Sequence, residues 1–268
     1  MSAIRVAIAG AAGRMGREAA RTLVQAEGIE VVAVIDREGV GESLQSIAGP
    51  ECPDLRIMGS VEDALAGTPC DVLLELTHPD SAASHIACAL RHGVASVVGT
   101  SGIDDASLRQ IAKLCDSSQT PALIVPNFAL GAVLMMRFAE MAARWMPHVE
   151  IIELHHDRKA DAPSGTAVLT AKRVDAARQT RPPLPKTLIK ADGARGGEVC
   201  GVPVHSVRLP GLVAHQKVLF GGAGETLTIA HDSLDRSSFM QGIVLCVREV
   251  RSLRGLVVGM DSLLFPGD

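Results

Sequence analysis

A glycine-rich turn close to the start of the chain restricts the possible fold more than any other feature. Residues 4–9 form an apolar run typical of a buried strand, and residues 14–27 have the pattern of a helix. Gly10, Gly13 and Gly16 lie at the junction and allow a tight turn, close approach of a pyrophosphate, and close helix–strand contact. The spacing departs slightly from Gly-x-Gly-x-x-Gly. It predicts a dinucleotide-binding turn, and the alternative is a turn that only joins a strand to a helix.

Short apolar runs alternate with helical patterns through the first half of the chain. The predicted strands are residues 4–9, 31–35, 72–75, 94–98 and 122–125. The predicted helices between them are residues 14–27, 61–66, 81–92 and 105–117. Apolar runs without polar alternation suit parallel strands that are covered on both faces. We therefore expect an α/β protein with a Rossmann-type doubly wound parallel sheet.

The pattern changes after Phe128. The predicted elements are helices at 130–146 and 165–177, strands at 149–154, 204–209, 214–220 and 226–231, and a closing helix at 237–250 before the tail at 256–264. The last three strands suggest an antiparallel meander. Residues 179–201 are rich in Pro, Gly and Lys and are expected to form an exposed loop. This part is expected to be a second, smaller α+β domain. The pattern leaves open whether the closing helix returns to the first domain.

Charged residues of both signs follow the second predicted strand. Asp36 is placed to accept a hydrogen bond from a ribose hydroxyl, as in NAD enzymes. Arg37 can instead pair with a 2′-phosphate, as in NADP enzymes, or be a solvated loop residue. Arg17, on the first helix, is a weaker candidate for the same task. The sequence thus leaves NADH and NADPH open.

Two further segments follow predicted strands at the sheet edge where ligands bind. Gly99-Thr100-Ser101-Gly102 offers small hydroxyl residues and glycines that leave room for a nicotinamide ring, and the alternative is a plain strand-to-helix turn. Pro126-Asn127-Phe128 is either a hinge between domains or a turn.

The densest chemistry lies in residues 153–167. His155 and His156 can exchange protons near neutral pH, and Lys159 is a point cation. Such a cluster suits a small substrate that carries carboxylates. The alternative is that the histidines end a strand and the lysine is a solvated loop charge.

The same segment runs into a predicted helix that begins near Gly165-Thr166. Asp161 and Ser164 are both possible N-caps for this helix. The first turn of a helix presents unpaired N–H groups, which can bind an anion such as a carboxylate.

Composition excludes several classes of protein. The net charge of −4, the absence of tyrosine and the single tryptophan argue against a nucleic-acid partner. The six cysteines have no Cys-x-x-Cys spacing, so neither a metal site nor a disulfide framework is expected. No signal peptide and no apolar run long enough to cross a bilayer is recognised. We expect a soluble, cytoplasmic protein without a membrane partner.

Taken together, the chain resembles the dihydrodipicolinate reductase (4-hydroxy-tetrahydrodipicolinate reductase) family over essentially its whole length. The residues that carry the resemblance are 10–16, 99–102, 126–128, 155–166 and 206–216. The His-His-x-x-Lys-x-Asp-Ala-Pro-Ser-Gly-Thr block is highly specific, whereas the glycine turn is common to many oxidoreductases. Ser101 departs from a common Gly-Thr-Thr-Gly form but keeps the hydroxyl.

The resemblance implies an NADH- or NADPH-dependent reduction of 4-hydroxy-tetrahydrodipicolinate to tetrahydrodipicolinate, with loss of water, in the diaminopimelate route to lysine. It also implies a dinucleotide-binding domain of residues 1–127 and 237–268, completed by the C-terminal segment. Residues 128–236 would form a substrate-binding and oligomerisation domain, and the protein would be a homotetramer.

The resemblance further implies roles for individual residues. His155 would be the proton donor and acceptor, and Lys159 a proton donor. The implied substrate contacts are His156, Gly165 and Thr166. The implied cofactor contacts are Gly10, Ala11, Ala12, Gly13, Arg14, Met15, Asp36, Arg37, Gly99, Thr100, Ser101, Val125, Pro126, Asn127 and Phe128. Two other functions compete: a related Rossmann reductase for another small acid, and a non-catalytic nicotinamide sensor. The His-His-x-x-Lys block counts against the first, and the second has no use for His155 and Lys159 together.

Overall fold

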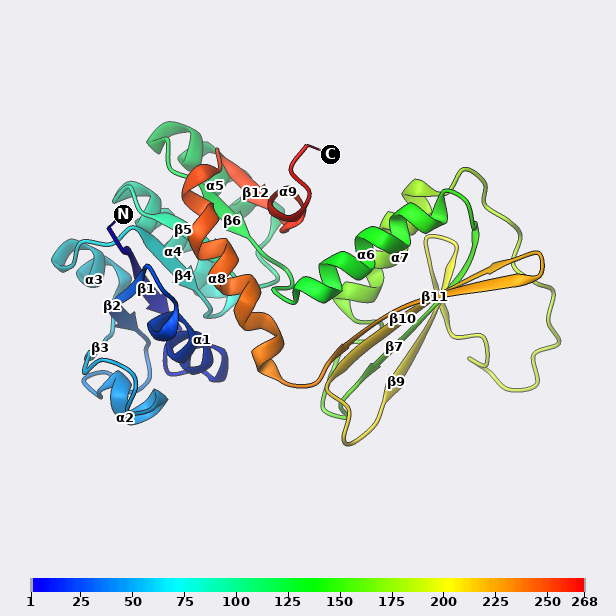
Figure 1. Ribbon diagram of the computed structural model, residues 1–268, viewed down its shortest axis with the longest axis horizontal. Helices are drawn as coiled ribbons and strands as arrows, with labels where there is room; N and C mark the ends of the chain where they lie inside the picture. The colour runs from blue at the N-terminus through cyan, green and yellow to red at the C-terminus, as the bar shows by residue number, and fades with distance from the viewer. Residues whose placement is uncertain (1, 268) are drawn as a thin grey trace. The chain divides into compact units, whose positions relative to one another are not determined.

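A computed structural model describes residues 2–267 of the chain and shows two compact units (Figure 1). One unit contains the chain up to Phe128 together with the segment from Phe239 onward. The other unit is Ala129–Ser238. Among the described residues, no helix has both the length and the apolar character needed to cross a membrane.

The first unit is built of strands joined by helices. Its strands are β1 (Ile4–Ala9), β2 (Ile29–Ile35), β3 (Ile57–Met58), β4 (Val72–Glu75), β5 (Ala95–Val98), β6 (Ala122–Ile124) and β12 (Leu256–Val258). Its helices are α1 (Arg14–Gln25), α2 (Leu44–Ala48), α3 (Val61–Gly67), α4 (Pro79–Arg91), α5 (Asp105–Ser118), α8 (Met240–Glu249) and α9 (Asp261–Leu264). Short 3-10 turns at Arg236–Phe239 and Val250–Ser252 flank α8. The sequence patterns missed α2, β3, β12 and α9, which are all short.

The seven strands form one sheet in the order β12-β6-β5-β4-β1-β2-β3, and every pairing is parallel. This confirms the predicted Rossmann-type sheet. Strand β12 pairs with β6, so the C-terminal segment returns to the sheet of the first unit. The sequence pattern alone had left this return open.

Helices cover this sheet so completely that the strands need no polar face. Val6, Ala7, Ile8 and Ala9 are consecutive residues of β1, and all are fully buried. Side chains of α3 and α4 pack on β1, β2 and β4, and side chains of α4 and α5 pack on β5 and β6. Helix α1 packs on β1 and β2 and also contacts α8. Burial on both faces explains the unbroken apolar runs, and each large side chain contributes roughly 1.5–3 kcal/mol.

The second unit is a five-stranded sheet with two helices. It contains α6 (Leu130–Ala143), β7 (His148–His155), α7 (Gly165–Ala177), β8 (Gly197–Val199), β9 (Val202–Arg208), β10 (Ala214–Gly222) and β11 (Glu225–Ser233). The strand order is β11-β10-β7-β9-β8. Helices α6 and α7 pack against each other and against the sheet (Figure 1).

The predicted antiparallel meander is wrong for β9. Strand β9 pairs in parallel with β7, and β10 pairs with β7 on the other side, so β9 and β10 are not neighbours. A parallel pair needs a crossover, and α7 lies in that crossover between β7 and β9. Only β10 and β11 form the expected antiparallel hairpin. Alternation of apolar and polar residues predicts strands, but it does not give their order.

The predicted loop at 179–201 needs a smaller correction. Residues 179–196 contain neither helix nor strand and are mostly exposed, but Gly197–Val199 forms β8 and pairs with β9. The strand has only three residues and lies among glycines, so the sequence has no apolar pattern that predicts it.

The glycine-rich turn after β1 depends on the absence of side chains at two positions. Gly10 has a φ of +88°, in the region that glycine favours. A Cβ atom on Gly16 would lie 2.0 Å from the carbonyl oxygen of Gly10, so α1 approaches β1 too closely for any larger residue. This close contact fixes the direction in which α1 leaves the sheet.

We expect Gly16→Ala to lower the free energy of unfolding by roughly 1–3 kcal/mol, because the added methyl group must push the backbone of the turn aside. Gly67→Ala is the matched control, since among residues 2–267 no heavy atom beyond its own helix and chain neighbours lies within 4 Å of the added Cβ. The control should leave the stability unchanged or raise it by up to about 1 kcal/mol. Urea unfolding followed by circular dichroism measures both, and equal effects would contradict the close-contact explanation.

Candidate functional site

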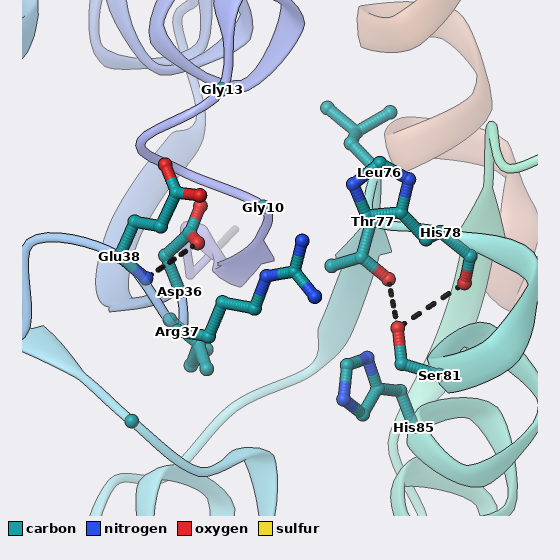
Figure 2. Close-up of a pocket in the computed structure, with 12 residues that line it drawn as sticks. Gly10, Gly13, Asp36, Arg37, Glu38, Leu76, Thr77, His78, Ser81 and His85 are labelled. Carbon is teal, nitrogen blue, oxygen red and sulfur yellow. Dashed lines mark hydrogen bonds between the residues drawn. The ribbon is translucent and has the colours of Figure 1, made fainter.

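The first unit has a pocket of about 230 Å³ where β1, β2 and β4 end. Four of the residues predicted to bind a cofactor line it: Gly10, Gly13, Asp36 and Arg37. The other lining residues, which the sequence patterns do not indicate, are Ile35, Glu38, Gly59, Leu76, Thr77, His78, Ser81 and His85. Figure 2 shows Asp36, Arg37 and Glu38 on one side of the pocket, facing Thr77, Ser81 and His85 on the other.

The start of α1 lies at this pocket and has no side-chain cap. Gly13 is the N-cap residue of α1, and no side chain caps the helix there. The turn is held by its backbone, since the N–H groups of Gly10 and Ala11 both donate to the carbonyl of Ile35. An uncapped helix N-terminus beside glycines fits the phosphates of a dinucleotide.

Asp36 and Arg37 differ in how they are held. The Asp36 carboxylate accepts hydrogen bonds from the N–H of Ala12 at 2.9 Å and from the N–H of Glu38 at 3.1 Å. Arg37 extends across the pocket towards Leu76 and Thr77 (Figure 2). Arg17, the weaker candidate, is not among the lining residues and donates to the carbonyl of Ala12 at 2.8 Å. Asp36 is therefore fixed against the glycine turn, and Arg37 reaches into the pocket.

A buried carboxylate joins the loops that follow β4 and β5. Glu75 is fully buried and accepts hydrogen bonds from the hydroxyls of Thr77 and Thr100. Its other partner is Nδ1 of His85, at 3.3 Å. The Gly99 N–H also donates to the Glu75 carbonyl at 2.9 Å. The 99–101 loop is thus anchored beside Thr77 and Leu76, two residues that line the pocket.

The other predicted cofactor loops lie near this anchor but outside the lining of the pocket. A Cβ atom on Gly99 would lie 2.6 Å from the ring of Phe128 and 2.8 Å from Leu76, so these three residues are in close contact. The Val125 N–H donates to the carbonyl of Val98 at 2.7 Å. The structure thus brings residues 99 and 128 together, as expected for two loops at one edge of a parallel sheet. The segment 76–81 could have been found by the same rule, because it follows β4.

In the second unit, charged and ionisable side chains lie together where β7 ends. Glu153 and His155 are two residues apart on β7, so both side chains lie on the same face. Arg208 on β9 is the register partner of His155. Its guanidinium donates to Glu153 in a bidentate pair, with distances of 3.0 Å to Oε2 and 2.8 Å to Oε1. The sheet register therefore places a histidine, a carboxylate and an arginine together.

His155 is held by the Glu153 carboxylate. Its Nδ1 lies 2.5 Å from Oε2 of Glu153. Burial lowers the pKa of His155, the charges of Lys159 and Arg208 lower it further, and Glu153 opposes them; the net shift is downward. Since a carboxylate only accepts, Nδ1 carries the proton and Nε2 has the lone pair. Near neutral pH His155 is thus an uncharged imidazole that can accept a proton at Nε2.

The loop after His155 carries the cation predicted from sequence. Nζ of Lys159 forms an ion pair with Asp161 at 2.7 Å, and this contact holds the pKa of Asp161 below its ordinary value. The Lys159 N–H donates to the carbonyl of His156 at 3.2 Å, which closes a turn. Nδ1 of His156 is buried and has no hydrogen-bond partner among residues 2–267. A substrate carboxylate would compete with Asp161 for Lys159.

Ser164 alone caps α7, so Asp161 is not an N-cap. The Ser164 hydroxyl accepts from the N–H of Ala167 at 3.2 Å. Gln216 of β10 donates to the Thr170 hydroxyl at 2.7 Å, and that hydroxyl donates to the carbonyl of Thr166 at 2.7 Å. Around Gly165, by contrast, no described heavy atom beyond its chain neighbours and helix lies within 4 Å of where a Cβ would sit. The first turn of α7 is thus fixed to the sheet while its start stays accessible.

Comparisons with known proteins agree over both units. The family model for "Dihydrodipicolinate reductase, N-terminus" matches residues 4–128, and the model for "Dihydrodipicolinate reductase, C-terminus" matches residues 131–264. The chain is 48% identical to 4-hydroxy-tetrahydrodipicolinate reductase of Lysinibacillus sphaericus (strain C3-41), with 97% of this chain and 99% of the relative covered. It is 49% identical to the enzyme of the same name from Geobacillus kaustophilus (strain HTA426), with 97% and 99% covered.

The chain belongs to the dihydrodipicolinate reductase family. A solved structure, dipicolinate-bound dihydrodipicolinate reductase from Paenisporosarcina sp. TG-14, has a TM-score of 0.86 and 42% identity, covering 97% of this chain and 99% of that one. One unit of the chain contains the pocket lined by Gly10, Gly13, Asp36 and Arg37, and the other contains the contacts of His155 with Glu153 and of Lys159 with Asp161.

Proposed function

We propose that this chain reduces 4-hydroxy-tetrahydrodipicolinate to tetrahydrodipicolinate with loss of water, in lysine synthesis through diaminopimelate. The main support for this proposal is the arrangement at the end of β7. There, His155 offers an imidazole Nε2 and Lys159 an ammonium group, just before the capped start of α7. A small ring with two carboxylates needs this combination of proton exchange and anion binding. Membership in the dihydrodipicolinate reductase family supports this substrate over that of another Rossmann reductase.

Two residues would carry the proton chemistry. The net reaction adds one hydride and one proton to the ring and releases one water. His155 is the proton donor and acceptor, since its Nε2 can take up a proton and return it to the ring. Lys159 neutralises a carboxylate and lends a proton as negative charge builds on the conjugated system.

Substrate binding would use the residues around these two. The backbone N–H groups at Gly165 and Thr166 hold the second carboxylate at the start of α7. His156 orients the ring, and its buried, unpartnered Nδ1 suits a polar contact with the ligand. Residues 128–236 would be the substrate-binding domain.

The first unit would bind the nicotinamide cofactor. When bound, the reduced nicotinamide supplies the hydride. The turn residues Gly10, Ala11, Ala12, Gly13, Arg14 and Met15 receive the pyrophosphate, and the fit rests on the uncapped start of α1. Gly99, Thr100, Ser101, Val125, Pro126, Asn127 and Phe128 line the nicotinamide end. Residues 1–127 and 237–268 would form this domain.

Both NADH and NADPH would serve as cofactor. Asp36 can accept a hydrogen bond from a ribose hydroxyl, whereas Arg37 can pair with a 2′-phosphate. The two side chains enter the same pocket, so neither cofactor is rejected by charge alone (Figure 2).

The second unit would also assemble the chain into a homotetramer in the cytoplasm. Strand β11 ends the five-stranded sheet, and most of its residues are exposed. Such an edge is normally covered in proteins that stay soluble. We expect sedimentation equilibrium to give four times the mass of the chain, and a monomer at micromolar concentration would contradict the proposal.

The function is tested by following NADH and NADPH oxidation by absorbance, with the substrate generated in situ from pyruvate and aspartate semialdehyde. We expect turnover that depends on all components. Omission of either precursor is the control. Tight cofactor binding without turnover would instead support a nicotinamide sensor.

Lys159→Ala should lower kcat/KM by about two to four powers of ten, because both a charge-stabilising group and a proton donor are lost. Lys159→Arg keeps the charge but cannot release a proton, so it should recover substrate binding more than kcat. Lys172→Ala, an exposed lysine on α7, is the matched control and should behave like the wild type. Near-normal steady-state kinetics of Lys159→Ala would refute the assignment.

Arg37→Ala should raise KM for NADPH by roughly 10- to 100-fold and change KM for NADH little, because a charge-assisted hydrogen bond to the 2′-phosphate contributes roughly 1.5–3 kcal/mol. Asp36→Ala should act mainly on NADH. Arg56→Ala, an exposed arginine paired with Asp54, is the control. Equal effects of Arg37→Ala on both cofactors would show that Arg37 does not read the 2′-phosphate.

A further inference from the structure

Glu153 is a fully buried carboxylate that the proposed reaction leaves without a role. Burial raises its pKa, but hydrogen bonds from Arg208, Ser206 and His155 outweigh burial, and the pKa lies below its ordinary value. Glu153 is therefore ionised near neutral pH. A buried charge is costly unless it is paired and fully hydrogen-bonded, so each partner of this carboxylate is held in a defined place.

The partners of Glu153 come from three separate segments, which are β7, β9 and the start of α7. His155 follows it on β7, and Arg208 reaches it from β9. The N–H of Ser164, the N-cap residue of α7, donates to Oε1 at 3.3 Å. Arg208 also donates to the carbonyl of Asp161 at 2.6 Å, which ties the end of the Lys159 loop to the same ion pair. One carboxylate thus connects the histidine, the lysine loop and the helix start.

We propose that Glu153, held by Arg208, is a positioning residue that fixes His155 as the Nδ1–H tautomer with Nε2 available to the substrate. The inference rests on the proposed function for the role of His155. The tautomer itself follows from the contacts, because Oε2 of the ionised Glu153 lies 2.5 Å from Nδ1 of His155 and can only accept a hydrogen bond from it. An imidazole without this partner would exchange between two tautomers, and only one of them presents a lone pair at Nε2.

The charges around His155 give the proposal a second consequence. The charged groups that act on it are Glu153 from β7, Arg208 from β9 and Lys159 from the following loop, which is itself paired with Asp161. Glu153 is the one that favours the protonated imidazole. Removal of its charge leaves the two cations, so protonation of His155 should require a lower pH.

Glu153→Gln tests this arrangement, and Glu150→Gln is a matched control. Glu150 lies on the same strand and also pairs with an arginine and a histidine, Arg195 and His205, but does not contact His155. Glu153→Gln should lower kcat on the order of 10- to 100-fold, the size of the loss seen when the hydrogen-bond partner that orients a metal-bound histidine is removed. KM for the cofactor should not change. The limb of the pH–kcat profile that belongs to His155 should move to lower pH, whereas Glu150→Gln should keep the wild-type profile.

The tautomer is measured independently by ¹⁵N–¹H NMR of the histidine side chains in the unmodified protein. We expect a protonated Nδ1 and an unprotonated Nε2 for His155 at neutral pH. The opposite tautomer, or a folded Glu153→Gln with the kcat and pH profile of Glu150→Gln, would overturn the proposal. If the Glu153→Gln variant does not fold, the tautomer of His155 measured in the unmodified protein decides whether the proposal holds. Absence of reductase activity in the wild type would instead refute the proposed function and leave the tautomer result standing.

Discussion

The ion pair between the fully buried Glu153 and the half-buried Arg208 is the constraint on which the arrangement at the end of β7 depends. The pair joins β7 to β9 at the point where both strands end, and it reaches Ser164 and the carbonyl of Asp161. Removing one partner of a buried pair typically costs about 3–5 kcal/mol, because the other charge stays buried. The same contacts that stabilise the sheet therefore also hold the segment that carries His155 and Lys159.

The first unit uses a buried carboxylate in a comparable way. Glu75 is the last residue of β4, and its carboxylate accepts hydrogen bonds from the hydroxyls of Thr77 and Thr100, which lie in two different loops. The loops therefore start from a fixed anchor at the edge of the sheet. In both units, a strand carries a buried carboxylate, and the carboxylate holds the neighbouring segments that would bind ligands. Precise positioning of this kind is what hydride and proton transfer require.

Much of the fold could be predicted because the signals were local. The five strands and four helices expected in the first half all occur within two residues of their predicted ends. Ser164 caps α7, because it directly precedes the helix, and Asp161 pairs with Lys159 instead. Contacts between distant residues gave no such signal: Glu153 and Arg208 are 55 residues apart. The parallel pairing of β7 and β9 and the return of β12 to β6 are also long-range and were not predictable from periodicity.

The most direct measurement is a crystal structure of the ternary complex with oxidised cofactor and pyridine-2,6-dicarboxylate. We expect one carboxylate within hydrogen-bond distance of Nζ of Lys159 and the other on the backbone N–H groups at Gly165 and Thr166. Nε2 of His155 should face the ring, and the nicotinamide should lie against the opposite side of that ring. A dicarboxylate bound away from these groups, or an imidazole turned away from Glu153, would contradict the proposed roles of His155 and Lys159.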